Sequence, residues 1–309
     1  MAGFDPSPES PPLFSVIIGA FNDWAPLNEC FRSLAAQPPG PSFEVLVVDD
    51  GSSEPAPVSI KAWGRYFPLR IESQAHLGVS TARNRGVALS RGSALLFVDA
   101  DCKFELNCLE ALAASMKKWP QHSCFQLRLV GESSTLLGRV EELRLLTLMG
   151  HLLQPDGCIR YLNTAGFALR RTRVDVEKGV FDPTAYRAED TLLLANLIQG
   201  GELPFLAADA NVQHSISMSL AKCFVKDIRS AYLEGVTYNV IDAKGVRIRV
   251  TYRERFQMLK SMWKVSKQKS IGRAAWFVLV GRQVLRLFVL LFTKTFRIKP
   301  DPHRGPDSP

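Results

Sequence analysis

The sequence predicts an α/β fold, in which a Rossmann-like sheet flanked by helices is followed by a basic, helical C-terminal appendage. The first observation is an alternation of short apolar segments with segments of helical periodicity, which is typical of parallel strands joined by right-handed crossovers. The second is the placement of acidic residues directly after the apolar segments. The third is a strong asymmetry of charge between the front and the back of the chain.

The alternation is clearest in the first hundred residues. Apolar segments bounded by Gly, Pro or Asp predict buried strands at 14–18, 43–48 and 93–98, and a further strand is expected near 69–72. Apolar residues at helical spacing predict helices between them, at 26–36, 58–66 and 78–92. The second half is less regular: we expect helices at 106–119, 136–153 and 188–199, and strands at 124–130, 166–171, 204–207 and 210–213. The apolar helix at 136–153 is expected to lie across the site described next.

Two carboxylates, Asp99 and Asp101, follow the strand at 93–98 at once. Open α/β sheets bind ligands at the carboxyl ends of their strands, so both are expected at the mouth of a site. Their oxygens suit hard cations such as Mg²⁺ or Mn²⁺, which commonly bridge to substrate phosphates. An isolated Asp-x-Asp is also a common solvated turn, so the motif has to be interpreted with its surroundings.

Other polar residues occupy comparable places. Asp49 and Asp50 follow the second strand, Glu189 and Asp190 begin a helix, and His214 follows the last strand. Each has a structural alternative, because Asp-Gly is ordinary turn chemistry, acids favour a helix start, and a single His is often a packed histidine. Together they indicate a phosphorylated, metal-bridged donor, with one carboxylate left for proton transfer.

Charge divides the chain. Residues 1–221 carry 19 Lys and Arg against 24 Asp and Glu, a balance of −5, whereas residues 222–299 carry 18 against 4, a balance of +14. We therefore expect a disordered leader at 1–12, a catalytic domain at 13–221, a basic helical region at 222–299 and a disordered tail at 300–309. The six cysteines form no Cys-x-x-Cys pair and no zinc spacing, so we expect buried thiols in a reducing compartment.

The basic region predicts helices at 219–242, 251–264 and 274–293. The last is nearly long enough to span a bilayer, but Arg282 and Arg286 lie near its centre. We expect it to lie on an anionic membrane surface rather than to cross the bilayer, and the alternative is a helical subdomain packed on the core. Large aliphatic residues alternate with the basic ones, which disfavours nucleic-acid binding.

Seven short motifs occur along the chain in an order that is more specific than any one of them. Ser15-Val-Ile-Ile18, Val47-Val-Asp-Asp-Gly-Ser52, Ala82-Arg-Asn-Arg-Gly86, Phe97-Val-Asp-Ala-Asp101, Gly179-Val-Phe-Asp182, Ala188-Glu-Asp190 and His214 occur in this order. The series resembles bacterial-type family-2 glycosyltransferases of the inverting GT-A type over roughly residues 13–240. The resemblance implies a GT-A fold with a mixed sheet. It also implies metal-assisted transfer of a single hexosyl or related sugar from a nucleotide-sugar donor to a hydroxyl of a lipid-linked or glycan acceptor.

The resemblance also implies roles for individual residues. Asp99 and Asp101 match the motif that holds the ribose and the divalent metal, with Asp101 favoured as the metal ligand, and His214 matches a histidine that touches metal or pyrophosphate in some relatives. Asp190 matches the base that deprotonates the acceptor, and Glu189 is expected to brace the donor sugar or the helix start. The remaining candidates for nucleotide contacts are Phe21, Asp49, Asp50, Arg83 and Asn84.

Two departures from the family pattern bear on specificity. Phe21 stands where the family usually has Tyr, so it can stack on a base without a phenol hydrogen bond. Gln283-Val-Leu-Arg286 is followed by Leu287 instead of the Trp of processive members, and we interpret this match as coincidental.

Two classes of function remain. The first is a glycosyltransferase of polysaccharide or glycolipid synthesis, cytoplasmic and peripherally attached to the inner face of the cell membrane. The second is a non-catalytic GT-A-fold scaffold on the membrane. The presence of Asp99, Asp101, Asp190 and His214 favours the enzyme. A nucleotidyltransferase is disfavoured because the loop after the first strand lacks Lys and Arg.

Overall fold

The computed structural model describes residues 10–132, 134–184, 189–214, 219–243, 245–246, 248, 250–269 and 271–295. Most of the expected leader, the expected tail and Ala188 lie outside these residues.

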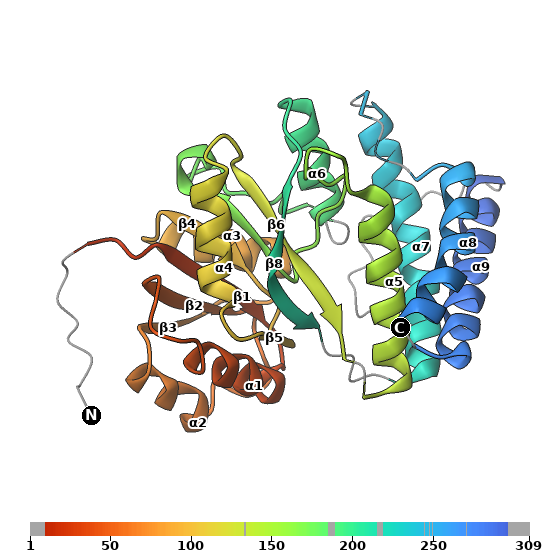
Figure 1. Cartoon of the computed structure of the whole chain (residues 1–309). Helices are drawn as coiled ribbons and strands as arrows, with labels where there is room; N and C mark the ends of the chain where they lie inside the picture. The colour runs from red at the N-terminus through yellow and green to blue at the C-terminus, as the bar shows by residue number, and fades with distance from the viewer. Residues whose placement is uncertain are drawn as a thin grey trace.

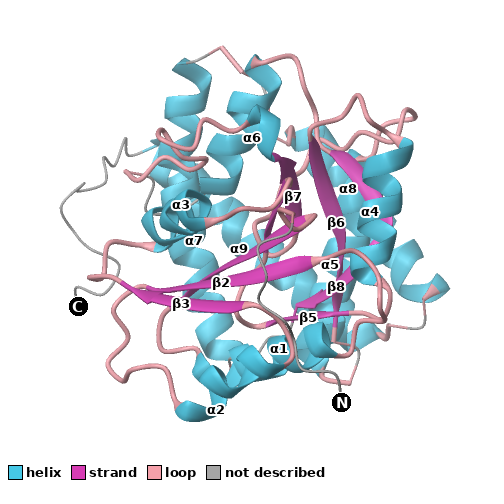
Figure 2. Cartoon of the chain, turned by 90° about the vertical axis from the view of Figure 1, so that its left-hand side faces the viewer, coloured by secondary structure: helices cyan, strands magenta, loops and turns pink. Residues whose placement is uncertain are grey.

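A mixed sheet forms the centre of the molecule, with helices on both sides (Figures 1 and 2). Among the described residues it has the strand order β3-β2-β1-β4-β7-β6-β8-β5. The strands are β1 (Phe14–Ala20), β2 (Phe43–Asp49), β3 (Leu69–Ser73), β4 (Ala94–Phe97), β5 (Cys102–Phe104), β6 (Cys124–Gly131), β7 (Phe167–Arg170) and β8 (Phe205–His214).

The first half of the sheet is the expected parallel unit. Strand β1 lies between β2 and β4 and is parallel to both, and β3 is parallel to β2. The second half is mixed, because β7 is antiparallel to β4 and to β6, whereas β8 is parallel to β6. Strands β1, β2 and β4 are almost wholly buried, as their unbroken apolar segments predict.

The structure differs from the predicted strands in two places. The segments at 204–207 and 210–213 form one strand, β8, in which a register shift against β6 absorbs Ala208 and Asp209 between them. The three-residue strand β5 was not predicted at all. It pairs with β8, and its alternating burial is too short a pattern to identify from sequence.

The helices are α1 (Trp24–Ala35), α2 (Val58–Lys61), α3 (Val79–Leu89), α4 (Cys108–Lys118), α5 (Leu136–Leu152), α6 (Glu189–Gln199), α7 (Leu220–Ala243), α8 (Tyr252–Gln268) and α9 (Arg273–Thr295). The helix expected at 58–66 divides into α2 and a 3₁₀ turn at Ala62–Arg65. All six cysteines are buried and unpaired, as expected.

Helices α5, α7, α8 and α9 stand side by side beyond the edge of the sheet (Figure 1). Val140 and Leu143 of α5 share an apolar cluster with Met262 of α8 and with Ala275 and Leu279 of α9. The basic region is therefore packed on the α/β part through α5.

Helix α9 has two unlike faces. Ala275, Leu279 and Arg282 are buried, and the Arg282 guanidinium donates to both oxygens of the buried Asp227 at 2.6 and 3.1 Å. The opposite face exposes Phe277, Val284, Phe288, Leu291 and Phe292. The segment Arg273–Phe292 is long and apolar enough to cross a membrane by length and composition alone.

Candidate active site

The carboxyl end of β4 leads into a turn that carries both aspartates of the Asp-x-Asp motif. The backbone N–H of Cys102 donates to the carbonyl of Asp99 at 3.1 Å, and the chain enters β5 directly. Strand β5 is antiparallel to β8 with Cys102 opposite His214. This register brings His214 Nε2 to 3.4 Å from Asp101 Oδ2.

The Asp101–His214 pair fits a divalent cation. The ligand atoms of Asp101, Cys102 and His214 lie within 4.8 Å of one another. Carboxylate oxygen and imidazole nitrogen suit Mn²⁺, whereas the thiol is a soft ligand that such an ion does not need. Although burial disfavours the imidazolium, the hydrogen bond with Asp101 raises the pKa of His214 above its ordinary value. Because a metal binds the neutral imidazole, a cation and a proton would compete for His214.

Asp99 lies outside this cluster and is held by Arg83. The guanidinium of Arg83 is buried, with Nη2 at 2.6 Å from Asp99 Oδ1 and Nη1 at 2.8 Å from Glu189 Oε1. One side chain thus joins the Asp-x-Asp turn to the first residue of α6. We expected Arg83 beside the nucleotide, and this bridge was not foreseen.

Asp190 is the second residue of α6 and lies on the wall of a large cavity. Its Oδ1 accepts hydrogen bonds from the backbone N–H of Thr191 at 2.6 Å and from the Thr191 hydroxyl at 3.1 Å. Burial, followed by the charge of Glu189, nevertheless raises the pKa of Asp190 to about 7. A carboxyl group with this pKa can accept a proton near neutral pH.

The acids that follow β2 hold the loops around them. Asp49 accepts from the backbone N–H of Ser52 at 3.0 Å and from the Ser73 hydroxyl at 3.2 Å. Asp50 is buried and accepts from the backbone N–H groups of Leu77 and Gly78, both at 2.9 Å, just before α3. Their contact with a nucleotide stays a prediction.

Phe21 and His76 form a stacked pair at the same end of the site. Their ring centroids lie 4.3 Å apart, and His76 Nδ1 is 2.9 Å from Asp50 Oδ2. Phe21 is partly exposed, which leaves it available to stack on a planar ligand.

Asn84 has a structural task in this protein. Its Oδ1 accepts from the backbone N–H groups of Val180 and Phe181, both at 2.9 Å, and its Nδ2 donates to the Phe181 carbonyl at 2.7 Å. The segment before α6 is thus tied to α3, next to Arg83.

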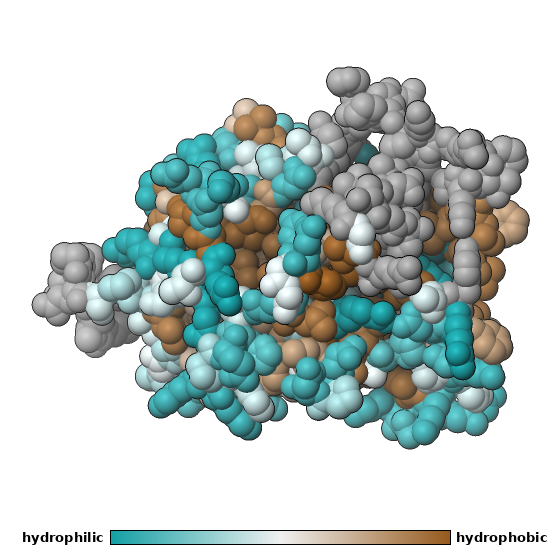
Figure 3. Space-filling view, turned by 90° about the horizontal axis from the view of Figure 1, so that it is seen from above, coloured by the Kyte–Doolittle hydropathy of each residue, from teal (hydrophilic) through white to brown (hydrophobic). Residues whose placement is uncertain are grey.

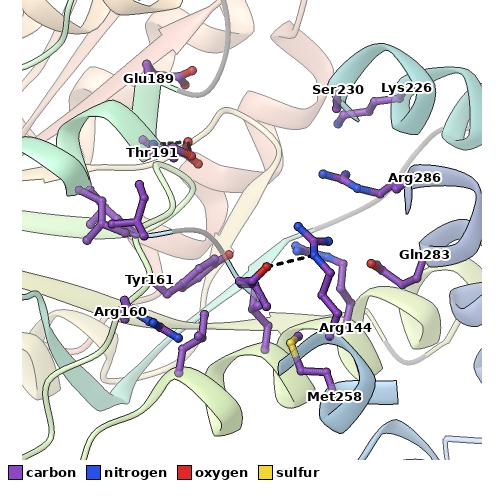
Figure 4. A pocket seen from close by; sticks show the side chains of 18 of the residues that line it. Arg144, Arg160, Tyr161, Glu189, Thr191, Lys226, Ser230, Met258, Gln283 and Arg286 are labelled. Atoms are coloured by element: carbon purple, nitrogen blue, oxygen red, sulfur yellow. Dashed lines mark hydrogen bonds between the residues drawn. The ribbon is translucent and has the colours of Figure 1, made fainter. Parts of the chain in front are cut away.

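A cavity of about 720 Å³ extends from His76 and Gly78 past Asp190 to the C-terminal helices. In Figure 4, Glu189, Thr191 and Tyr161 lie on one side, and Lys226, Ser230, Gln283 and Arg286 face them from α7 and α9. Seen from above, hydrophobic side chains are visible near the middle of this face, between hydrophilic ones (Figure 3).

Several lining residues were missed or interpreted differently. Arg144, Arg160 and Tyr161 line the cavity, and the sequence carried no motif that singled them out. Gln283 and Arg286, whose spacing we interpreted as coincidental, both line it as well. Leu148 and Leu152 of α5 also line it, in agreement with a helix lying across the site.

Residues 15–177, more than half of the chain, match the family model "Glycosyl transferase family 2". The chain belongs to glycosyl transferase family 2. Curated relatives include the PGL/p-HBAD biosynthesis glycosyltransferase of Mycobacterium bovis, 39% identical over 106 residues, or 33% of this chain and 41% of the relative. The uncharacterized glycosyltransferase YibD of Escherichia coli is 35% identical over 88 residues, which are 28% of this chain and 25% of YibD. This family-2 chain thus spans well under two thirds of the length of these relatives.

Solved structures with a similar fold cover nearly the whole family-2 chain. The mannosyltransferase PcManGT from Pyrobaculum calidifontis, in complex with GDP-Man and Mn²⁺, has a TM-score of 0.63 at 12% identity and covers 96% of this chain and 90% of its own. S. aureus TarS 1-349, in complex with UDP-GlcNAc, has a TM-score of 0.53 at 16% identity. The match covers 92% of this chain and 91% of the TarS chain. The mixed sheet flanked by helices is the GT-A fold that the motif series predicted.

Proposed function

We propose that the protein is an inverting glycosyltransferase that moves one sugar from a nucleotide-sugar donor to an acceptor hydroxyl. The observation that carries this proposal is an ion-pair bridge between the segments that hold two chemically different groups. One group is the Asp101–His214 pair, which suits a divalent cation, and the other is Asp190, whose pKa is about 7. Arg83 joins the two segments, because it pairs both with Asp99 of the Asp-x-Asp turn and with Glu189, the neighbour of Asp190.

The residues divide the reaction between them. Asp190 takes the proton from the acceptor hydroxyl, whose oxygen forms the new bond to the anomeric carbon while the bond to the diphosphate oxygen breaks. Attack from the face opposite the leaving group inverts the anomeric centre. A bound divalent cation would neutralise charge that develops on the leaving diphosphate. Arg83 holds Asp99 and α6 in place throughout.

The similar structures support the donor class and the cation. PcManGT was solved with GDP-Man and Mn²⁺, and TarS with UDP-GlcNAc. Nucleoside diphosphate sugars with Mn²⁺ are therefore the first compounds to test here.

We also propose that the protein acts at the cytoplasmic membrane face, attached peripherally. Phe277, Val284, Phe288 and Leu291, which are exposed on α9, follow one another at spacings of seven, four and three, so they form one stripe along the helix. The opposite face is packed on α5 and α7, and it holds the buried Arg282–Asp227 ion pair. This division favours a helix lying in the interface over one that spans the bilayer.

The donor site is tested by Asp101→Ala. Wild type is expected to hydrolyse or transfer from a UDP- or GDP-sugar only with Mn²⁺, and Mn²⁺ with the nucleoside diphosphate should raise its Tm. Asp101→Ala should lose this Tm shift, and its turnover should fall by about 10²-fold or more. Asp209→Ala removes an exposed Asp from the same strand as His214 and is the control. An absence of turnover in wild type with every nucleotide sugar would favour the non-catalytic scaffold.

A further inference from the structure

The cavity has an unusual second half, beyond Asp190 as seen from the donor site. Its wall there is built by α5, α8 and α9 and is largely aliphatic, with Leu148, Leu152, Leu259, Met262 and Leu287 among the lining residues. A volume of about 720 Å³ is within the range of cavities that enclose most of a small ligand. The apolar wall indicates an occupant with a hydrocarbon part.

The same half of the cavity contains a surplus of positive charge. The cationic lining residues are Arg144, Arg160, Lys226, Arg255 and Arg286, against the acids Glu189 and Asp190. Asp190 has its pKa raised to about 7, and Glu189 is already paired with Arg83. Among the described residues, neither of these two lining acids forms an ion pair with a cation of this wall.

Some of these cations have protein partners and some do not. Arg144 binds Glu141 through two nitrogens, and Arg160 pairs with Glu254. Arg286 lies 3.7 Å from Asp227, which already binds Arg282. Within the described part of the chain, Lys226 and Arg255 form no ion pair with a carboxylate, although Lys226 lies close enough to Asp101 for its charge to favour the ionised carboxylate. Arg255 Nε donates to the Val250 carbonyl at 3.3 Å. Cations beside an apolar wall are stabilised by an anionic ligand.

We propose that the acceptor is an anionic amphiphile whose phosphate or diphosphate group binds beside Arg255, Lys226 and Arg286 and whose hydrocarbon chain lies against α8 and α9. This inference rests on the proposed function, since it places the reacting hydroxyl of the acceptor at Asp190. A phosphate oxygen as the nucleophile fits less well, because a phosphate monoester is already ionised near neutral pH and needs no base. The phosphate is thus a binding group, and a hydroxyl carried by the same molecule accepts the sugar.

Binding of simple probes to the full chain tests the inference without knowledge of the acceptor sugar. The probes are farnesyl phosphate, farnesol, inorganic phosphate and a short-chain phosphatidylglycerol, each below its micellar concentration and titrated by calorimetry. Farnesyl phosphate should bind at least tenfold more tightly than each of the other three.

Two pairs of variants assign that preference to the two parts of the wall. Arg255→Gln should abolish the preference over farnesol, whereas Arg253→Gln, which changes an exposed arginine of the same helix, should retain it. Leu287→Asn should abolish the preference over inorganic phosphate, whereas Val225→Asn, at an exposed position next to Lys226, should retain it.

Each contrary result has its own meaning. Equal binding of farnesol and farnesyl phosphate would overturn the anionic part. Equal binding of phosphatidylglycerol would overturn the assignment to the acceptor, because the cavity would then be a site for membrane headgroups. Binding of Mn²⁺ with UDP or GDP is measured on the same samples. If that binding is present and the farnesyl phosphate preference is absent, this inference fails alone; if nucleotide binding is absent, the proposed function fails.

Discussion

Asp190 is the side chain whose ionisation is expected to set the pH dependence of the reaction. Its pKa of about 7 means that the proton-accepting form prevails only above that pH. Turnover should therefore rise about tenfold per pH unit below pH 7 and level off above it. Asp190→Asn keeps the shape and removes the proton acceptor, so turnover should fall by about 10²-fold or more while donor affinity stays near wild type.

Glu189→Gln is the matched variant for this experiment. The carboxylate of Glu189 is paired with Arg83, so its loss should disturb the bridge to Asp99 and affect donor binding more than turnover. Activity in Asp190→Asn together with inactivity in Glu189→Gln would assign the base to Glu189.

The same carboxyl group gives a separate prediction for stability. The pKa of Asp190 in the folded protein is about 7, above the ordinary value of 3.8, so the folded state keeps the proton to higher pH than the unfolded chain. Its contribution to the free energy of unfolding is therefore full below pH 4 and is lost as the pH rises through 7. Asp190→Asn has no carboxyl group to ionise, so its stability does not fall with pH for this reason. Urea unfolding at pH 4 to 8 should therefore show that the free energy of unfolding of the mutant increases relative to that of wild type as the pH rises. Parallel curves would contradict the raised pKa.

At the residue scale, sequence reasoning works where position along a strand decides the outcome. Asp101 follows β4 and His214 ends β8, and the resemblance of the motif series assigned both to the metal, although the β5–β8 pairing that brings them together was not predicted. The Arg83 bridge could not be anticipated, because it depends on how α6 is placed against α3. From helical periodicity alone, Arg83 fits a solvent-exposed helix face as well as a place in the site. The folded structure decides between the two, because it buries Arg83 between Asp99 and Glu189.

At the scale of elements, the segment that leads from β7 to α6 depends on a glycine. Gly179 has φ +75°, and a Cβ there would lie 2.6 Å from Cγ of Asn84, the side chain that ties this segment to α3. In Gly179→Ala, the left-handed conformation would be strained and some of the Asn84 hydrogen bonds would be lost. Together these effects should lower the free energy of unfolding by about 3 kcal/mol.

Gly201→Ala separates these two costs. Gly201 has φ +79°, but a Cβ there meets nothing within 4 Å, so only the conformational cost of about 1–2 kcal/mol applies. Guanidinium unfolding of both variants provides the comparison. Equal losses of stability would mean that the contact of Asn84 with this segment contributes nothing.

Strands with nearly continuous apolar segments were predictable, and strands that depend on pairing with a partner strand were not. Strands β1, β2 and β4 are buried on both faces and therefore appear in the sequence as unbroken apolar segments. Strand β5 has three residues and exists because β8 pairs with it. Ala208 and Asp209 are exposed and lie between the two predicted segments, but a register shift against β6 accommodates them without ending β8.

For the whole molecule, the charge asymmetry has a structural counterpart. The basic helices α7, α8 and α9 form one side of the cavity, and α5 connects them to the sheet. The sequence indicated a separate appendage because its composition changes at about residue 222. It could not indicate the shared cavity, since residues on α5, α8 and α9 that are far apart in the chain approach one another only after folding.

Membrane attachment is the last consequence of this arrangement. Phe288 is 72% exposed in the middle of the apolar stripe of α9, and basic residues surround this helix in the sequence. Phe288→Glu introduces a charge into the surface that is expected to enter the lipid interface, so flotation with anionic liposomes at low salt should fall several-fold. Val58→Glu, at a position 82% exposed on α2, should float like wild type. Deletion of α9 would be a poorer test, because Ala275 and Leu279 belong to the packed cluster with α5 and their loss would disturb the fold. If Phe288→Glu floats as well as wild type, the stripe faces something other than lipid, and the basic region is a packing domain alone.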